Sequence, residues 1–190
     1  MENSKKILLN SNVEIAEYII NLYKESTNNK LDEINNNSIS KIKLQKSLYF
    51  LYALWFKYQQ ILLNGEEAKI SKEVISNNSK KNIIELFDIT FFAWKYGPVD
   101  EEIYENQKNR NFSRKSYKID LKFNDKLNLN INQIERIKIF INLQLKNIFL
   151  IEDFILVNKS HSDISWKNAV DDIGPGSEMD SYLIYKQYNE

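Results

Sequence analysis

The segment from residue 91 to residue 104, FFAWKYGPVDEEIY, restricts the fold more than any other part of the chain. Apolar and other residues alternate over 87–93 with the period of a strand. The chain has only two prolines and four glycines, so the pair Gly97-Pro98 marks a rigid corner. Pro98 fits the first turn of a helix, where its missing N–H is not needed. Acidic residues at 100–102 then suit a helix N-terminus. The segment therefore predicts a strand, a corner and a helix that reaches about Lys108.

Hydrophobic periodicity predicts that most of the other elements are helices. The expected segments are residues 13–25, residues 40–63, a long stretch from Asn132 that breaks near Asn147, residues 166–170, and a last helix containing Met179 and Ile184. Residues 117–123 alternate as a second strand, which we expect to pair antiparallel with the first. Without a repeat or a long linker, the chain is expected to form one domain over residues 1–190. The predicted class is α+β and mostly α, a helical bundle with a small antiparallel β-sheet.

Composition excludes several classes of protein. The chain has no cysteine, which excludes a disulfide scaffold, a zinc site with cysteine ligands and a thiol nucleophile. Its 26 basic and 26 acidic residues cancel, so no overall field attracts nucleic acid or an anionic membrane. The sequence shows neither a secretion leader nor about 20 consecutive apolar residues. We therefore expect a cytoplasmic protein that does not enter a membrane.

The known sequence motifs of phosphate, dinucleotide and metal sites are absent. Residues 160–163, Ser-His-Ser-Asp, contain the letters of a hydrolase triad, but sequence neighbours cannot point at one another as a triad requires. We therefore expect no enzyme, with no catalytic residue, cofactor or metal. A hydrolase that uses His161 is the alternative from a different class.

Basic residues gather between Lys108 and Lys118, with Phe112 and Tyr117 among them. Such a segment could bind phosphates and stack on bases, which keeps a nucleic-acid partner as an alternative. The favoured interpretation is a solvated loop beside an edge strand, where lysine discourages further pairing.

Aromatic residues on one face of the predicted strand are either covered, as core residues of a central strand, which is the commoner case, or exposed as a surface for a protein partner. Phe92, Trp94 and Tyr96 alternate along that face, and exposed Trp and Tyr concentrate binding energy. Lys43 and Lys46 lie three residues apart on a helix without acids, where they could meet either an acidic partner or the acidic C-terminal part of the chain itself. The predicted partner-binding residues are Lys43, Lys46, Trp94, Lys95, Tyr96 and Asp100.

Three segments, in this order, resemble one known family: KIKLQKSLYFLYALW (residues 41–55), LFDITFFAWKYGPVDEEIY (residues 86–104) and SHSDISWKNAV (residues 160–170). They resemble the Panacea domain, also described as the SocA-like antitoxin or phage-associated GepA-type domain. The resemblance implies a mostly helical fold and an antitoxin that binds and blocks a co-encoded toxin, in some members as an adaptor to a protease. It also implies an alternative, a phage or mobile-element inhibitor of a host defence nuclease of CRISPR or restriction type.

The resemblance also selects residues whose role, binding or packing, it leaves open. These residues are Leu44, Gln45, Leu48, Tyr49, Gly97, Pro98, Val99, His161 and Trp166. We expect Leu44, Leu48 and Trp166 to lie in the core. The partner is expected to be a protein, with the oligomeric state of the chain left open.

Overall fold

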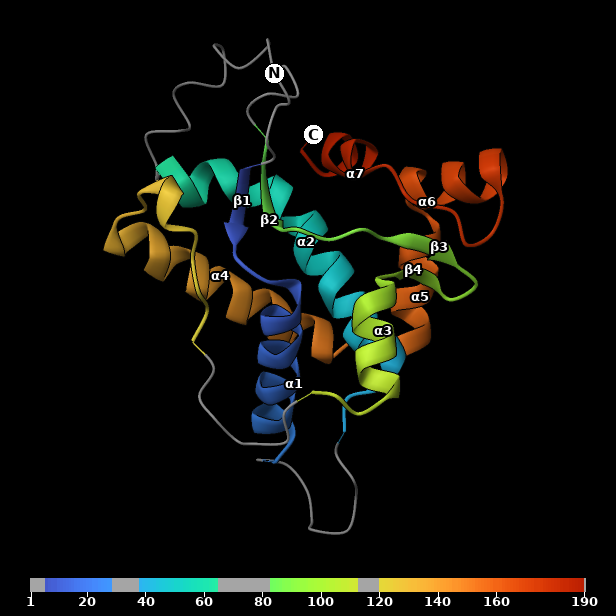
Figure 1. Ribbon diagram of the computed structural model, residues 1–190, viewed down its shortest axis with the longest axis horizontal. Helices are drawn as coiled ribbons and strands as arrows, with labels where there is room; N and C mark the ends of the chain where they lie inside the picture. The colour runs from blue at the N-terminus through green and yellow to red at the C-terminus, as the bar shows by residue number, and fades with distance from the viewer. Residues whose placement is uncertain (1–5, 29–37, 65–82, 113–119, 190) are drawn as a thin grey trace.

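The computed structural model describes residues 6–28, 38–64, 83–112 and 120–189 (Figure 1). Within these ranges the helices are α1 (Asn12–Asn28), α2 (Lys41–Asn64), α3 (Glu101–Lys108), α4 (Ile131–Phe149), α5 (Asp153–His161), α6 (Ile164–Asn168) and α7 (Ser181–Tyr188). The strands are β1 (Lys6–Leu9), β2 (Ile84–Phe87), β3 (Phe92–Trp94) and β4 (Gly97–Val99). The expected mostly helical α+β fold is confirmed. None of the helices in the described ranges is long and apolar enough to cross a membrane.

Helix α2 forms the centre of the molecule, with α1, α4, α5 and α7 packed around it (Figure 1). It begins after Ser40, whose hydroxyl accepts a hydrogen bond from the Lys43 N–H at 2.9 Å. Its buried residues occur on nearly every side of the helix, including Leu44, Leu48 and Trp55. A helix apolar all round is stable only when it is covered all round, as the sequence predicted.

The predicted strand before Gly97 is divided into two separate strands. β2 ends at Phe87 and pairs in parallel with β1, while β3 begins at Phe92 and pairs antiparallel with β4. Gly97 lies opposite Trp94 in this hairpin, so the Gly-Pro pair belongs to a strand, and its expected place at the start of a helix is wrong. Pro98 is tolerated because β4 is at the edge of a two-stranded pair, where a missing N–H costs little.

Helix α3 starts later than the sequence predicted, at Glu101. Asp100 is its N-cap: the carboxylate accepts a hydrogen bond from the Ile103 N–H at 2.8 Å. An aspartate N-cap accepts hydrogen bonds from the free N–H groups of the first helical turn. Pro98 lies three residues before Glu101 and belongs to the extended strand β4. The predicted end of this helix at Lys108 is confirmed.

The second predicted strand pairs differently from the prediction. Its first residues, 117–119, lie outside the described ranges. Phe123 forms an isolated antiparallel bridge with Leu9 of β1, and the Asn124 N–H donates to the Leu8 carbonyl at 2.8 Å. This segment therefore adds to β1, a short strand that the sequence analysis did not predict, and the expected pairing with the strand before Gly97 is wrong.

The C-terminal segment covers the free edge of β3. Glu178 bridges Phe92, and the Met179 N–H donates to the Phe91 carbonyl at 2.8 Å. Helix α7 follows and buries Ile184 against the core. Helix α4 begins with a capping box at Asn130 and ends at Phe149, close to the expected break.

Candidate protein-binding corner

The corner, which we define as residues 94–100, lies directly on α2 and α5. Gly97 has φ +86°, a conformation that L side chains rarely adopt. A Cβ added there would lie 2.3 Å from Ser160 Oγ and 2.8 Å from Lys46 Cε. The backbone of β4 can therefore approach both helices this closely only because residue 97 has no side chain.

Lys46 is fully buried beneath this corner. Its ammonium donates to the Pro98 carbonyl at 2.8 Å, and it forms no ion pair with any carboxylate of the described residues. Burial in a low-dielectric interior disfavours the charged form, which lowers the pKa of Lys46 to about 7. The predicted role of Lys46 in direct contact with a partner does not fit this position, because its side chain holds the corner from inside.

Gln45 fixes the other end of the corner. Its amide oxygen accepts from the Asp100 N–H at 2.9 Å, and its amide nitrogen donates to the Asp100 carbonyl at 3.1 Å. The side chain of Gln45 thus imitates a neighbouring strand. Asp100 itself is buried, and desolvation raises the pKa of its carboxyl although the cap bond to Ile103 opposes that shift. The prediction that Asp100 faces a partner is therefore wrong, since it caps α3.

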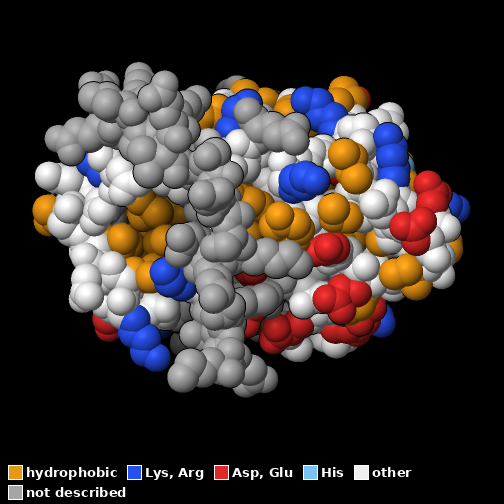
Figure 2. Space-filling view, turned by 90° about the horizontal axis from the view of Figure 1, so that it is seen from above, with side chains coloured by type: hydrophobic (Ala, Val, Ile, Leu, Met, Phe, Trp, Pro, Cys, Tyr) orange, Lys and Arg blue, Asp and Glu red, His pale blue; other side chains and the backbone are white. Residues whose placement is uncertain are grey.

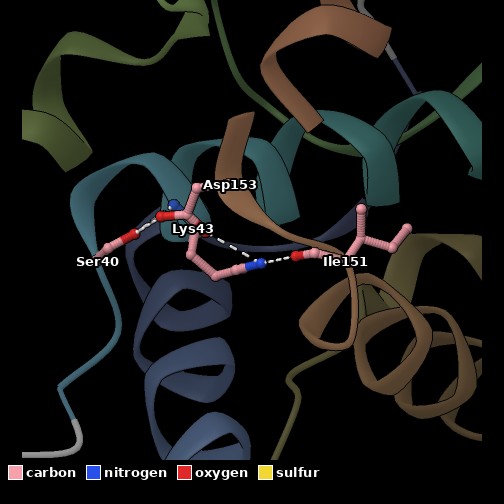
Figure 3. A network of polar contacts seen from close by, with 4 residues as sticks. All are labelled: Ser40, Lys43, Ile151 and Asp153. Carbon is pink, nitrogen blue, oxygen red and sulfur yellow. Dashed lines mark hydrogen bonds and ion pairs between the residues drawn. The ribbon is translucent and has the colours of Figure 1, made fainter. Parts of the chain in front are cut away.

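Lys43 links the start of α2 to the junction between α4 and α5 (Figure 3). Its ammonium lies 3.0 Å from Asp153 Oδ1 and also donates to the Ile151 carbonyl. The Ser40 hydroxyl donates to the other carboxylate oxygen, Asp153 Oδ2. Lys43 is buried in this network, so its predicted place on a partner-binding surface is also corrected.

Asp163 joins three helices through one buried carboxylate. Its Oδ2 accepts from the hydroxyls of Tyr49 at 2.6 Å and Tyr188 at 2.9 Å, and its Oδ1 accepts from the Gln187 amide at 2.9 Å. Burial and the nearby carboxylate both raise the pKa of the two tyrosines. Tyr49 is therefore a packing and anchoring residue, one of the roles that the resemblance left open.

Three residues of the supposed triad segment, Ser160, His161 and Asp163, have separate partners. The Ser160 hydroxyl is buried and donates to the Val157 carbonyl at 2.8 Å, while Asp163 holds α7. His161 stacks on Trp166, with ring centroids 4.0 Å apart. Burial is the main cause that lowers the pKa of His161, and the nearby Lys46 adds to it. This arrangement supplies no chain of hydrogen bonds from acid to base to nucleophile.

Trp166 supports the corner from a third side. Its indole N–H donates to the Trp94 carbonyl at 3.3 Å, and its side chain is partly buried against the core. Leu44 and Leu48 are fully buried, so their expected place in the core is confirmed. Val99 is buried as well, opposite Phe92 in the hairpin.

Two of the six predicted partner-binding residues are exposed at the tip of the corner. Tyr96 is 49% exposed and its ring lies 6.4 Å from that of Phe154, which is 63% exposed on α5. The Lys95 ammonium lies 5.6 Å from the Tyr96 ring. We call Tyr96 and Phe154 the exposed aromatic pair. The sequence analysis did not select Phe154, because no motif or resemblance marks that position.

Trp94 lies between core and surface. Its ring packs against Tyr104 of α3 at 5.0 Å, and the Lys41 ammonium lies 4.8 Å from the Tyr104 ring. Figure 2, seen from above relative to Figure 1, shows most of the acidic side chains of this face gathered on one side, with hydrophobic side chains beside them and basic ones at their margins. The balanced net charge therefore hides a surface with local charge differences.

Metal and nucleic-acid sites have little support in the described ranges. Those residues include no group of three or more His, Asp or Glu placed to hold a metal. Lys108 pairs with Glu105 at 3.0 Å, and most of the basic segment that follows, residues 113–119, lies outside the described ranges. Comparisons with protein-family models, with curated proteins and with solved structures find no match for this chain.

Proposed function

We propose that this chain is a non-enzymatic antitoxin, which neutralises a protein partner by binding it directly at the corner. The observation that carries this proposal is the exposed aromatic pair at the tip of a corner whose base is buried and hydrogen-bonded. Aromatic side chains in such positions dominate the energy of many protein interfaces. The resemblance of the same segments to SocA-like antitoxins supports the same function.

Rigidity of the corner would favour tight binding. Lys46, Gln45 and Trp166 each donate to a corner carbonyl, so the backbone around Tyr96 is fixed before a partner arrives. A preorganised surface loses less conformational entropy on association than a mobile loop does. We place this binding in the cytoplasm, which a chain without cysteine suits.

Expression in a bacterial host and affinity capture test the proposal. We expect a captured protein that is toxic when expressed alone and harmless when this chain is co-expressed. Tyr96→Ala with Phe154→Ala should weaken the complex at least tenfold, because a central aromatic pair contributes on the order of 2 kcal/mol or more. Ile61→Ala, at an exposed position near the C-terminal end of α2, serves as the matched control.

Three results would contradict the proposal. Full neutralisation by the Tyr96→Ala, Phe154→Ala variant would show that the corner is not the binding surface. Capture of a defence nuclease that is harmless when expressed alone would replace the antitoxin by the inhibitor of a host defence system. Turnover of an ester or peptide substrate, lost in His161→Ala, would establish the hydrolase alternative instead.

A further inference from the structure

Helix α4 exposes a row of large apolar side chains on its outer face. Their exposed fractions are 74% for Ile131, 65% for Ile139, 54% for Leu143 and 78% for Leu150, the residue that ends the helix. At about 100° per residue, these four positions fall within an arc of roughly 120°. Exposed apolar side chains that lie next to one another often mark an interaction surface, whereas single scattered ones are common on any protein.

The row lies opposite the side of α4 that packs on the core. Ile137, Ile141, Leu145 and Ile148 are buried against α1 and α2, and the centre of their arc lies about 140° from the centre of the exposed row. Figure 1 shows α4 starting at the left edge of the molecule and running inward, where its later part passes behind α1. Most of the exposed row therefore points away from the helices that α4 packs against. At one border of the same arc, Asn142 accepts a hydrogen bond from Tyr18 of α1 and Phe149 packs against Tyr23 of α1.

Two charged residues of opposite sign lie in the same arc. Glu135 and Lys146 are both exposed, and neither forms an ion pair with a described residue. The neighbouring cations of α4 are already engaged: Lys138 contacts Asp120 at 2.6 Å, and Arg136 donates to the Leu62 carbonyl at 3.1 Å. Glu135 and Lys146 thus remain available to an external partner.

The pattern of exposed apolar and charged residues along α4 is nearly the same when the helix is followed in the opposite direction. Reversal of α4 about the point between Phe140 and Ile141 exchanges Ile131 with Leu150 and Glu135 with Lys146, and it brings Ile139 close to Leu143. A two-fold dimer interface needs this self-complementarity, because each patch meets its own copy. An unrelated partner would need neither the apolar symmetry nor the exchange of charges.

We propose that α4 of one molecule packs antiparallel against α4 of a second copy, which makes the chain a two-fold homodimer. In this arrangement Ile139 and Leu143 form the centre of the interface, and Ile131 meets Leu150 of the second copy at each end. Glu135 faces Lys146 of the second copy, so two ion pairs flank the centre. Opposite charges across an interface fix its register and disfavour the parallel arrangement.

The size of α4 sets the expected strength of this dimer. A helix of 19 residues is about 28 Å long, and a single helix pair of that length buries less than the roughly 1,600 Å² of a standard interface. We therefore expect a dimer with a Kd on the order of micromolar rather than nanomolar. The dimer is independent of the corner, because its residues are distinct from Tyr96 and Phe154.

Sedimentation velocity of the full chain over a range of concentrations tests the dimer. The wild type should change from monomer to dimer as its concentration rises through the micromolar range. Leu143→Asp should remove the dimer, because it places a charge at the apolar centre. Circular dichroism and thermal unfolding establish that each variant is folded, which exposed positions on α4 should allow.

A charge exchange provides the sharper test. In the dimer, Glu135→Lys replaces each of the two ion pairs by two facing lysines and should weaken the dimer about tenfold. Lys146→Glu replaces each ion pair by two facing glutamates and should have the same effect. The double variant with both changes restores opposite charges and should return the Kd to within about threefold of the wild type. Tyr96→Ala serves as a control that leaves the dimer unchanged.

Three outcomes would overturn the proposal. The wild type could remain monomeric at several hundred micromolar. The dimer could survive Leu143→Asp, which would place its interface elsewhere. The double charge exchange could fail to restore what each single change removed, which would exclude the antiparallel register. None of these outcomes bears on neutralisation through the corner, so the two proposals fail separately.

Discussion

The Lys46 ammonium lies 2.8 Å from the Pro98 carbonyl oxygen, inside the molecule and with no carboxylate of the described residues paired to it. A buried lysine without a counter-ion normally costs free energy, since the charged form loses its hydration. Here the buried Lys46 side chain connects α2 directly to β4, and it passes beside Gly97. The lysine, the glycine and the proline carbonyl therefore act as one unit that fixes the corner.

The first prediction concerns Gly97, where alanine should be strongly destabilising. The new Cβ meets Ser160 Oγ at 2.3 Å and Lys46 Cε at 2.8 Å, and the residue must also keep a φ of +86°. Overpacking and strain of this kind together cost roughly 2–5 kcal/mol. Urea unfolding of the variant and the wild type measures the difference.

Gly176 offers a matched control for this prediction. It has φ +88°, but an added Cβ there meets nothing within 4 Å. Gly176→Ala should therefore cost only the backbone strain, on the order of 1 kcal/mol. Equal losses in the two variants would show that the contact with Lys46 and Ser160 does not limit residue 97.

The second prediction is a pH dependence that comes from Lys46. Its pKa is about 7 when folded and near the ordinary value of 10.5 when unfolded, so between these pH values the unfolded chain binds more protons. The free energy of unfolding contributed by this group therefore rises with pH from about 7 to about 10.5, by up to roughly 1.4 kcal/mol per pH unit. Below pH 7 both states are protonated and the contribution becomes constant.

Lys46→Met isolates this contribution. Methionine fills a similar volume without a charge, so the variant should lose the rise that the wild type shows between pH 7 and pH 9. Urea unfolding of both proteins at pH 7, 8 and 9 gives the difference in slope directly. Parallel curves would mean that Lys46 keeps an ordinary pKa in the folded protein. His161→Gln is a second variant for the same measurement, because it removes the titrating neighbour whose pKa Lys46 lowers.

The centre of the fold could be read from the sequence. Helix α2 carries apolar residues on all of its sides, a pattern that only a central helix satisfies, and Ser40 marks its start. The Gly-Pro pair was correctly recognised as a rigid point. Its exact place could not be predicted, because the fixed φ of proline suits both an edge strand and a first helical turn.

The buried polar residues of the candidate site were not predictable from local pattern. Lysine is rarely buried, so Lys43 and Lys46 were expected at the surface. Their burial depends on a carbonyl at Pro98 and a carboxylate at Asp153, each more than 50 residues away in the sequence. Only the tertiary structure brings such partners together. Tyr96, a partner-binding candidate whose face the sequence left as either core or surface, is exposed.

The third prediction concerns Asp163, which anchors the C-terminal helix. Asp163→Ala leaves the hydroxyls of Tyr49 and Tyr188 and the Gln187 amide without their acceptor. Because Tyr49 is fully buried, its hydroxyl cannot turn to water, and we expect a loss of about 2–4 kcal/mol. Tyr188→Phe, which removes one donor at a half-buried position, should cost about 1 kcal/mol.

Hydrogen exchange locates this effect. In Asp163→Ala the amides of α7, residues 181–188, should exchange faster than in the wild type, because the helix loses the carboxylate that links it to Tyr49 of α2, although the Ile164 N–H still donates to the Gln187 side chain. The exchange rates of the amides at the centre of α2 should change only as far as the global free energy of unfolding changes. Asp163→Asn keeps one oxygen acceptor and should fall between the alanine variant and the wild type. Unchanged exchange in α7 would show that the apolar contacts of Ile184 and of Tyr185 with Phe56 hold the helix without the carboxylate.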